Sequence, residues 1–266
     1  MEKATVFDSY GTMNESRKEF LVQLLPGLIA QMNIRTALDL GCGVGFFANC
    51  LASMGLDVTG VDARADNITE ARKRYPGVGF CVQDVEESTI LKMEPKDIVL
   101  CFGLLYHLEN PFRVIRNLFA LTRELTIVES MIAPHQAPAA VLLDERRAED
   151  QSLDCVAFVP SEECLVKMLY RAGFLAVYKP TIQPEHEEFK KTLRFKRRRS
   201  ALVASKKRVT SSMLVELPEP RVGNVWRKQW HYQMERILYF SGRSPSSQWK
   251  AVKNLIGRWR LDLQNH

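Results

Sequence analysis

The sequence lacks the features of a secreted, metal-bound or membrane-spanning protein. Its opening, MEKATVFDSYG, contains no apolar run, so we expect no signal peptide. Its longest apolar stretches, such as IVLCFGLLY, are far shorter than the ~20 residues that a membrane span needs. Its six cysteines form no C-x-x-C pair, and several lie inside apolar runs. We therefore expect no zinc or other metal site, and reduced thiols in a cytoplasmic protein.

Charge and tryptophan are distributed unevenly along the chain. Residues 1–189 hold 18 Lys and Arg against 27 Asp and Glu, whereas residues 190–266 hold 19 against 4. The two parts therefore carry net charges of −9 and +15, and all four tryptophans lie in the second part. Within it, SQWKAVKNLIGRWRLDL forms a basic amphipathic pattern on a helical wheel. Such a tail suits RNA phosphates, an anionic membrane surface, or the acidic body of the same chain.

Apolar runs alternate with helical patterns over most of the chain, which predicts an α/β fold. We expect helices over residues 8–32, 45–55, 65–75, 110–122 and 161–174. We expect strands over residues 36–40, 57–63, 77–84, 97–107, 122–130, 174–182 and 198–207. Because these strands are almost continuously apolar and their connections are short, the sheet should be covered on both faces. The sequence therefore predicts a doubly wound, mostly parallel sheet of seven strands.

The same pattern divides the chain into three parts. Residues 1–33 are expected to form an N-terminal helical cap or lid, and residues 34–208 the main domain. Residues 131–160, which are rich in proline and alanine, are expected as an insertion in that domain. Residues 209–266 are expected to form a basic, tryptophan-rich helical extension.

The stretch ALDLGCGVGFFA places three glycines directly after the first predicted strand. The dinucleotide fingerprint G-x-G-x-x-G would need its third glycine at Phe46, and the turn contains no Lys or Arg to hold a phosphate. It does contain a carboxylate, Asp39, at the end of the strand. This charge disfavours a pyrophosphate and favours a ligand with an ammonium or sulfonium group.

Further carboxylates follow the next two predicted strands. Asp62 comes about 20 residues after the glycine turn, where an acidic side chain can accept hydrogen bonds from ribose hydroxyls. Asp84 follows the third strand, where it can accept from an adenine amino group or, alternatively, cap a helix. These positions predict a ribonucleoside ligand without phosphates.

Four segments in this order carry a resemblance to a known family. ALDLGCGVGFFA, TGVDARADNITEAR, VQDVEE and DIVLCFGLLYHLENP resemble the successive motifs of class I, Rossmann-like S-adenosylmethionine-dependent methyltransferases of the type 11/12 group. The resemblance covers roughly residues 30–207 and implies S-adenosyl-L-methionine as cofactor and S-adenosyl-L-homocysteine as product.

The resemblance also implies which residues contact the cofactor. They lie in these motifs and in the segment before them: Asp39, Gly41, Cys42, Gly43, Gly45, Asp62, Ala63, Asp84, Val85, Phe102, Gly103 and Tyr10. Of these, Asp39, Gly41 and Gly43 are expected at the methionine end. Asp62 is expected at the ribose and Asp84 at the adenine.

Candidate catalytic residues follow the fourth and fifth strands. His107 is the general-base candidate, because imidazole titrates near neutral pH, although it could equally serve only to cap the turn. Tyr106 is expected beside the sulfonium or the acceptor. Glu129 is a second catalytic candidate, with a capping or solvated role as the alternative.

Other segments supply weaker candidates. Tyr10 and Arg17, in the N-terminal segment, are candidate contacts to the acceptor or to the methionine carboxylate, with an ordinary surface helix as the alternative. The insertion offers His135, Asp144 and Glu145 as candidates for the acceptor wall. The charge run KRRRS, residues 196–200, is expected to be a solvated face.

The segment LYHLENP also resembles the L-Y-H-x-x-x-P stretch of the bacterial tRNA wobble-uridine carboxymethyltransferases. Those enzymes use a carboxylated cofactor, and this segment holds no basic residue for an extra carboxylate. We therefore expect methyl transfer to an O or N nucleophile of a small-molecule acceptor. The alternatives are an RNA methyl- or carboxymethyltransferase that uses the basic tail, and a catalytically silent adenosylmethionine-binding or membrane-associated module.

Overall fold

The structure is a computed structural model, and it describes residues 11–135, 137–144, 156–190 and 198–220. Eight strands form the main sheet: β1 (Thr36–Leu40), β2 (Asp57–Asp62), β3 (Gly79–Val82), β4 (Lys96–Phe102), β5 (Thr122–Met131), β8 (Ala176–Pro180), β9 (Arg199–Ser205) and β10 (Leu214–Leu217). The helices are α1 (Gly11–Met32), α2 (Phe46–Ser53), α3 (Ala65–Arg74), α4 (Pro111–Leu121) and α5 (Glu162–Ala172), with short 3₁₀ turns η2 (Ser88–Lys92), η3 (Leu105–His107) and η4 (Glu187–Phe189).

The strand order of the main sheet is β10-β8-β9-β5-β4-β1-β2-β3. The five strands from β3 to β5 are parallel, whereas β9 pairs antiparallel with both β5 and β8, and β10 antiparallel with β8. The direction of winding reverses between β1 and β4, where Leu38 lies opposite Val99. The carboxyl ends of these two strands therefore form the switch point at which open α/β sheets bind ligands.

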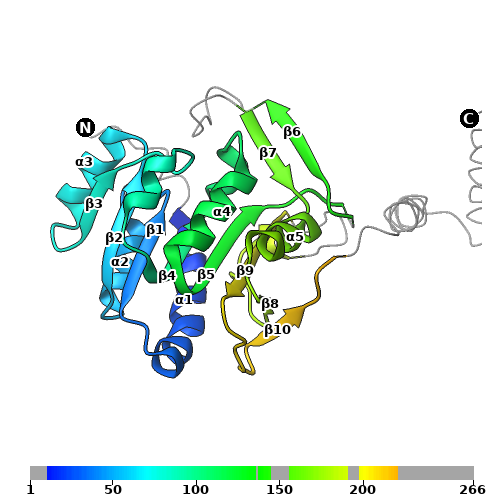
Figure 1. The fold of residues 1–266 in the computed structure, drawn as a ribbon. Helices are drawn as coiled ribbons and strands as arrows, with labels where there is room; N and C mark the ends of the chain where they lie inside the picture. Colours follow the sequence, from blue (N-terminus) through cyan, green and yellow to red (C-terminus); the bar gives the residue numbers. More distant parts are fainter. Residues whose placement is uncertain (1–10, 136, 145–155, 191–197, 221–266) are drawn as a thin grey trace, which may run out of the picture.

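Helices cover both faces of the sheet (Figure 1). The apolar sides of α1, α2 and α3 pack on one face, through residues such as Phe20, Leu51 and Ile68. The apolar sides of α4 and α5 pack on the other, through residues such as Val114 and Leu165. Alternate residues of each central strand enter the two clusters, which explains why the strands are apolar almost throughout.

Several local predictions are confirmed. Pro111 begins α4, where its missing N–H costs nothing. The Ser161 hydroxyl accepts a hydrogen bond from the backbone N–H of Cys164, and Gly173 ends α5 at a φ of 120°. The reversed strand pair is present as β8 and β9.

The strand number is a correction, because the sheet has eight strands rather than seven. The additional strand, β10, lies in residues 209–266, which we had expected to be helical. Its sequence, LVEL, is too short to stand out within a charged region. Residues 221–266, including the basic amphipathic pattern, lie outside the described residues.

The insertion forms a second, two-stranded sheet of β6 (Ala140–Asp144) and β7 (Val156–Pro160). This hairpin stands beside the main sheet, near the start of α4 in Figure 1. It contacts the turn η3 and packs the side chains of Ala157 and Val159 against Tyr106. The insertion is therefore attached to the switch-point edge of the sheet.

Candidate functional site

The glycine turn after β1 is built from left-handed backbone. Gly41, Gly43 and Gly45 have φ angles of 72°, 52° and 86°, a region that other residues adopt only with strain. The N–H groups of Gly41 and Cys42 donate to the carbonyl of Val61 on β2, both at 2.9 Å. The turn is thus held against the neighbouring strand at the switch point.

Asp39 lies buried beneath this turn. Only 1% of the residue is exposed, and its Oδ2 has no hydrogen-bond partner among the described residues. Burial raises the pKa of this carboxyl to about 7, a hydrogen bond from the backbone of Ala48 opposes the rise, and the charge of Asp62 adds to it. A buried carboxylate with one oxygen lacking a hydrogen bond favours a cationic ligand group nearby.

A cavity of about 360 Å³ opens at the switch point. The predicted site residues that line it are the cofactor candidates of the glycine turn and of the end of β4, together with the catalytic candidate of η3: Gly41, Cys42, Gly43, Phe102, Gly103 and Tyr106. Burial, followed by the charges of Asp39 and Asp62, raises the pKa of the Cys42 thiol far above its ordinary value. A buried thiol with a raised pKa is a poor nucleophile.

The first turns of α1 and the start of β9 complete the cavity. Gly11, Asn14 and Arg17 line it from α1, and Arg199 lines it from β9. Arg17 was a weak candidate from the sequence, and neither Asn14 nor Arg199 was predicted. Arg199 belongs to the run expected to be a solvated face, and this prediction is wrong for it, because the residue is only 4% exposed.

The two acidic residues predicted at the ribose and the adenine do not line this cavity in the described part of the chain. Asp62 supports the glycine turn from behind, because its Oδ2 accepts from the N–H of Gly43 at 2.9 Å. Its Oδ1 accepts from the N–H of Arg64. Asp84 accepts from the N–H of Glu86 at 2.8 Å and so closes a turn. Their nucleoside contacts remain predictions.

The remaining predicted cofactor residues are not among the described residues that line the cavity. Ala63 follows Asp62 at the end of β2 and is half-buried. Val85 is buried in the core on the α4 side of the sheet. Gly45 caps α2, and a side chain there would meet the ring of Phe80. Tyr10 lies outside the described residues.

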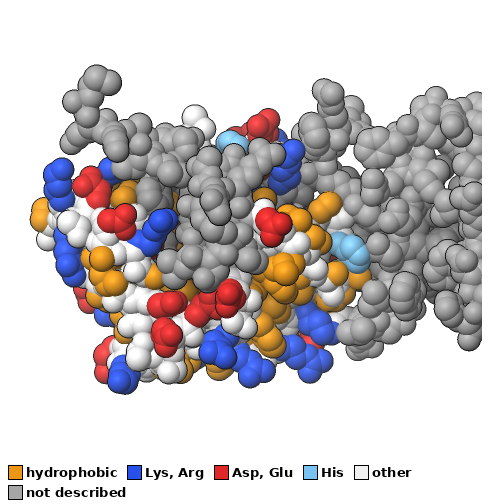
Figure 2. Space-filling model, turned by 90° about the horizontal axis from the view of Figure 1, so that it is seen from above, with side chains coloured by type: hydrophobic (Ala, Val, Ile, Leu, Met, Phe, Trp, Pro, Cys, Tyr) orange, Lys and Arg blue, Asp and Glu red, His pale blue; other side chains and the backbone are white. Residues whose placement is uncertain are grey.

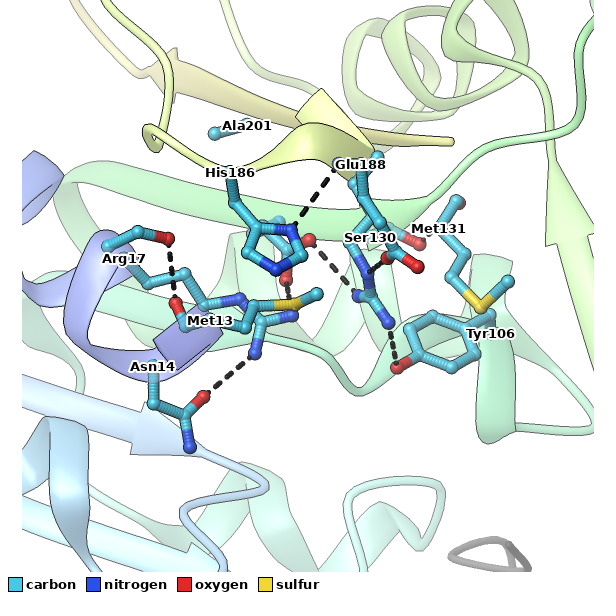
Figure 3. A network of polar contacts seen from close by, with 12 residues as sticks. Met13, Asn14, Arg17, Tyr106, Ser130, Met131, His186, Glu188 and Ala201 are labelled. Carbon is cyan, nitrogen blue, oxygen red and sulfur yellow. Dashed lines mark hydrogen bonds and ion pairs between the residues drawn. The ribbon is translucent and has the colours of Figure 1, made fainter. Parts of the chain in front are cut away.

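A buried polar network joins α1, β5, η3 and β9 at the cavity wall (Figure 3). Glu129, which is fully buried, accepts from the Nη2 of Arg17 at 2.7 Å and from the Nη1 of Arg199 at 3.2 Å. Arg199 also donates to the hydroxyl of Tyr106 at 3.0 Å and to Glu188 at 2.7 Å. The solvated role considered for Glu129 is therefore excluded, and its carboxylate holds two guanidinium groups in place.

The charge of Arg199 is secured by this network. Burial alone would lower the pKa of its guanidinium, but the contacts with Tyr106, Glu129 and Glu188 outweigh that cost and raise the pKa above its ordinary value. The guanidinium also lies over the ring of Tyr106, 5.2 Å from its centre. Tyr106, a predicted site residue, is thus fixed between β9 and the hairpin.

The other catalytic and wall candidates lie further from the cavity. His107 is half-buried, and its ring lies 4.1 Å from that of Tyr106, but among the described residues it is not part of the cavity lining. The Nδ1 of His135 contacts the backbone of Ala137 at the base of the hairpin. Asp144 is exposed at the end of β6, and Glu145 lies outside the described residues. Their proposed roles remain predictions.

The described residues hold no group of three or more metal-ligating side chains and no helix that could cross a membrane. Five described cysteines are free, Cys42, Cys50, Cys81, Cys101 and Cys164. Figure 2 shows acidic and basic side chains interspersed over the described part of one face, which is not a surface of a single charge.

Comparison with known proteins supports the sequence resemblance. A family model for a methyltransferase domain matches residues 38–125. A ubiquinone biosynthesis O-methyltransferase of Glaesserella parasuis is 32% identical over 98 residues, which are 34% of this chain and 42% of that protein. One from Photobacterium profundum is 39% identical over 29% of this chain and 35% of its own length. The chain thus spans less than half the length of these relatives.

Solved structures share the fold. The N-terminal domain of EvdMO1, solved with S-adenosylhomocysteine bound, has a TM-score of 0.56 at 17% identity, over 73% of this chain and 81% of that one. The magnesium protoporphyrin IX methyltransferase of Synechocystis PCC 6803 has a TM-score of 0.52 at 18% identity, over 78% and 90%. The chain therefore has the class I, Rossmann-like fold of S-adenosylmethionine-dependent methyltransferases, as the sequence predicted, and its residues 38–125 match a methyltransferase-domain model.

Proposed function

We propose that this protein is an S-adenosylmethionine-dependent methyltransferase that acts on an O or N nucleophile of a small-molecule acceptor. The observation that carries the proposal is the glycine turn at the switch point, which has no Lys or Arg to hold a phosphate. The turn lies above the buried carboxylate of Asp39 and at the wall of a cavity of about 360 Å³. The structural neighbours solved with S-adenosylhomocysteine support the choice of cofactor.

The residues present fit this cofactor. The Oδ2 of Asp39 lacks a partner, and its negative charge suits the ammonium and sulfonium of the methionine end. Gly41 and Gly43 let the backbone approach the ligand closely, and a side chain on Gly41 would meet Leu104. Arg17 lies 3.7 Å from the position of a side chain on Gly103 and would hold the methionine carboxylate.

The cofactor, when bound, supplies an electrophilic methyl group on a sulfonium. The task of the protein is then to align the acceptor with that group and to exclude water. Phe102, Gly103 and Tyr106 form the wall at the end of β4 where this alignment would take place. Asp62 would act on the cofactor through the glycine turn that it orders, in addition to its predicted ribose contact.

The class of acceptor is supported by the relatives. Those reported above are named ubiquinone biosynthesis O-methyltransferases, and this name indicates a small-molecule acceptor. LYHLENP itself has no basic residue, but Arg199 on β9 donates a hydrogen bond to Tyr106 of this segment. The lack of a basic residue in LYHLENP therefore no longer argues against carboxymethyl transfer. Mass spectrometry of the product distinguishes an added methyl group from a carboxymethyl group.

The proposal is tested by incubating the protein with S-adenosylmethionine labelled in its methyl group and a metabolite extract of the source organism. We expect label in small-molecule products with the wild type and much less with Asp62→Ala. The protein could bind S-adenosylhomocysteine and yet transfer label to no small-molecule or RNA fraction. This result would favour a catalytically silent adenosylmethionine-binding module. Cytoplasmic location, and partners of the basic tail such as RNA or a membrane, remain predictions.

A further inference from the structure

We infer that the acceptor carries a carboxylate, which Arg199 and the hydroxyl of Tyr106 bind at the β9 side of the cavity. This inference rests on the proposed function and specifies its substrate class. It starts from an arginine that is 4% exposed and yet lines the cavity.

Arg199 has donors left over. A guanidinium carries five N–H groups, and three are used within the protein: Nε to Glu188, Nη1 to Glu129 and Nη2 to Tyr106. Among the described residues, one N–H on each terminal nitrogen has no partner. The Tyr106 hydroxyl accepts from Arg199, so its own hydrogen is available to donate. Two N–H groups and one O–H group are therefore available on adjacent side chains of the cavity wall.

These donors suit an anion rather than a neutral group. Arginine does not deprotonate in proteins, so Arg199 cannot serve as a base for the transfer reaction. Its planar fork matches the two oxygens of a carboxylate, and charge-assisted hydrogen bonds of this kind are stronger than neutral ones. The spare donors of Arg199, beyond those held by Glu129 and Glu188, thus suit a carboxylate ligand.

The two arginines come from different elements of the cavity wall. The guanidinium of Arg17 lies within 3.9 Å of the position of a side chain on Gly103, and so does the Tyr106 hydroxyl that Arg199 contacts. Arg199 also lies over the ring of Tyr106, against which Ala157 and Val159 of the hairpin pack. We assign Arg17 to the cofactor carboxylate and Arg199, with these apolar residues beside it, to the acceptor.

The first test fractionates the acceptor activity. A metabolite extract is separated on an anion exchanger at pH 7, and each fraction is assayed with labelled S-adenosylmethionine. We expect the acceptor in retained fractions, and we expect activity to disappear after the carboxylates are converted to amides with a carbodiimide and an amine. Activity in the unretained fraction, or activity that survives amidation, would overturn the carboxylate while leaving the methyltransferase proposal standing. No transfer from any fraction would reject both.

The second test distinguishes the roles of the two arginines with the conservative substitutions Arg17→Lys and Arg199→Lys. Each keeps the positive charge and removes the planar guanidinium that can bind both oxygens of a carboxylate. Calorimetry of S-adenosylhomocysteine should show about tenfold weaker binding for Arg17→Lys and wild-type binding for Arg199→Lys. With the purified acceptor, Arg199→Lys should raise KM about tenfold or more. Arg198→Lys is the control, since that neighbouring side chain is 56% exposed. Equal loss of S-adenosylhomocysteine binding in both variants would assign Arg199 to the cofactor and overturn the inference.

Discussion

At the scale of single residues, Glu129 has the strongest structural role in the site. Its carboxylate is fully buried and holds Arg17 and Arg199, which come from opposite ends of the described chain. Removing one member of a buried charge network leaves the others without compensation, which costs far more than the loss of an exposed ion pair. Stability and site geometry therefore depend on the same carboxylate.

We predict that Glu129→Gln lowers the free energy of unfolding by about 3–5 kcal/mol, because two buried guanidinium groups lose their shared counter-charge. The matched control is Glu124→Gln on the same strand, β5, where Glu124 pairs with the exposed Lys207. This control should cost less than about 1 kcal/mol. Urea denaturation monitored by circular dichroism measures both, and equal losses would contradict the account of the network.

We predict that Asp39 makes the stability of the protein depend on pH. Burial raises its pKa from 3.8 to about 7, so the folded protein without cofactor holds a proton that the unfolded chain releases above about pH 4. The contribution of this carboxyl is therefore fully present below its unfolded pKa and is lost as the pH rises toward 7, in total about 4 kcal/mol. Asp39→Asn should remove this slope. Unfolding free energies of both proteins between pH 4 and pH 8 should diverge as the pH rises, and parallel curves would exclude the raised pKa.

At the scale of elements, α2 is bounded by two glycines with the same backbone angle and different surroundings. Gly45, before the helix, and Gly55, after it, both have φ of 86°. A side chain at Gly45 would lie 2.7 Å from the ring of Phe80, whereas one at Gly55 would meet nothing within 4 Å. The first glycine is thus needed for packing as well as for backbone conformation.

We predict that Gly55→Ala costs about 1–2 kcal/mol of stability from backbone strain alone. Gly45→Ala should cost clearly more, because the ring of Phe80 must also move, and it should weaken binding of S-adenosylhomocysteine. Thermal unfolding and calorimetry of the two variants give both quantities. Equal effects at the two positions would mean that the contact with Phe80 is unimportant.

Elements with strong local patterns were predictable. The apolar strands, the start of α4 at Pro111 and the Ser161 cap of α5 are each specified by neighbouring residues. The hairpin β6–β7 was missed, because its strands are short and lie in a proline- and alanine-rich segment. Arg199 was misjudged because its partner Glu129 is 70 residues away, and a run of basic residues gives no sign of such a pairing.

At the scale of the whole molecule, β10 is the edge strand of the main sheet. This strand pairs with β8, buries Leu214, and its Leu217 carbonyl accepts a hydrogen bond from the hydroxyl of Tyr170 on α5. The Tyr178 hydroxyl accepts from the backbone of Val209, just before the strand. The main sheet therefore includes residues beyond 208, the domain boundary expected from composition.

We predict that a chain ending at residue 220 unfolds cooperatively, whereas a chain ending at residue 208 is markedly less stable. The shorter chain lacks β10 and exposes the backbone edge of β8, which can pair with other chains. Thermal unfolding and light scattering compare the two. Equal stability and solubility would show that β10 does not belong to the cooperative unit.

The central claim is that the switch-point turn binds S-adenosylmethionine, and calorimetry with S-adenosylhomocysteine tests it most directly. Asp62 and Asp57 lie at opposite ends of β2, and the Asp57 side chain is 78% exposed. We expect one site per chain in the wild type, the same affinity in Asp57→Asn, and at least about tenfold weaker binding in Asp62→Asn. No binding to the wild type, or equal binding to all three proteins, would contradict the account.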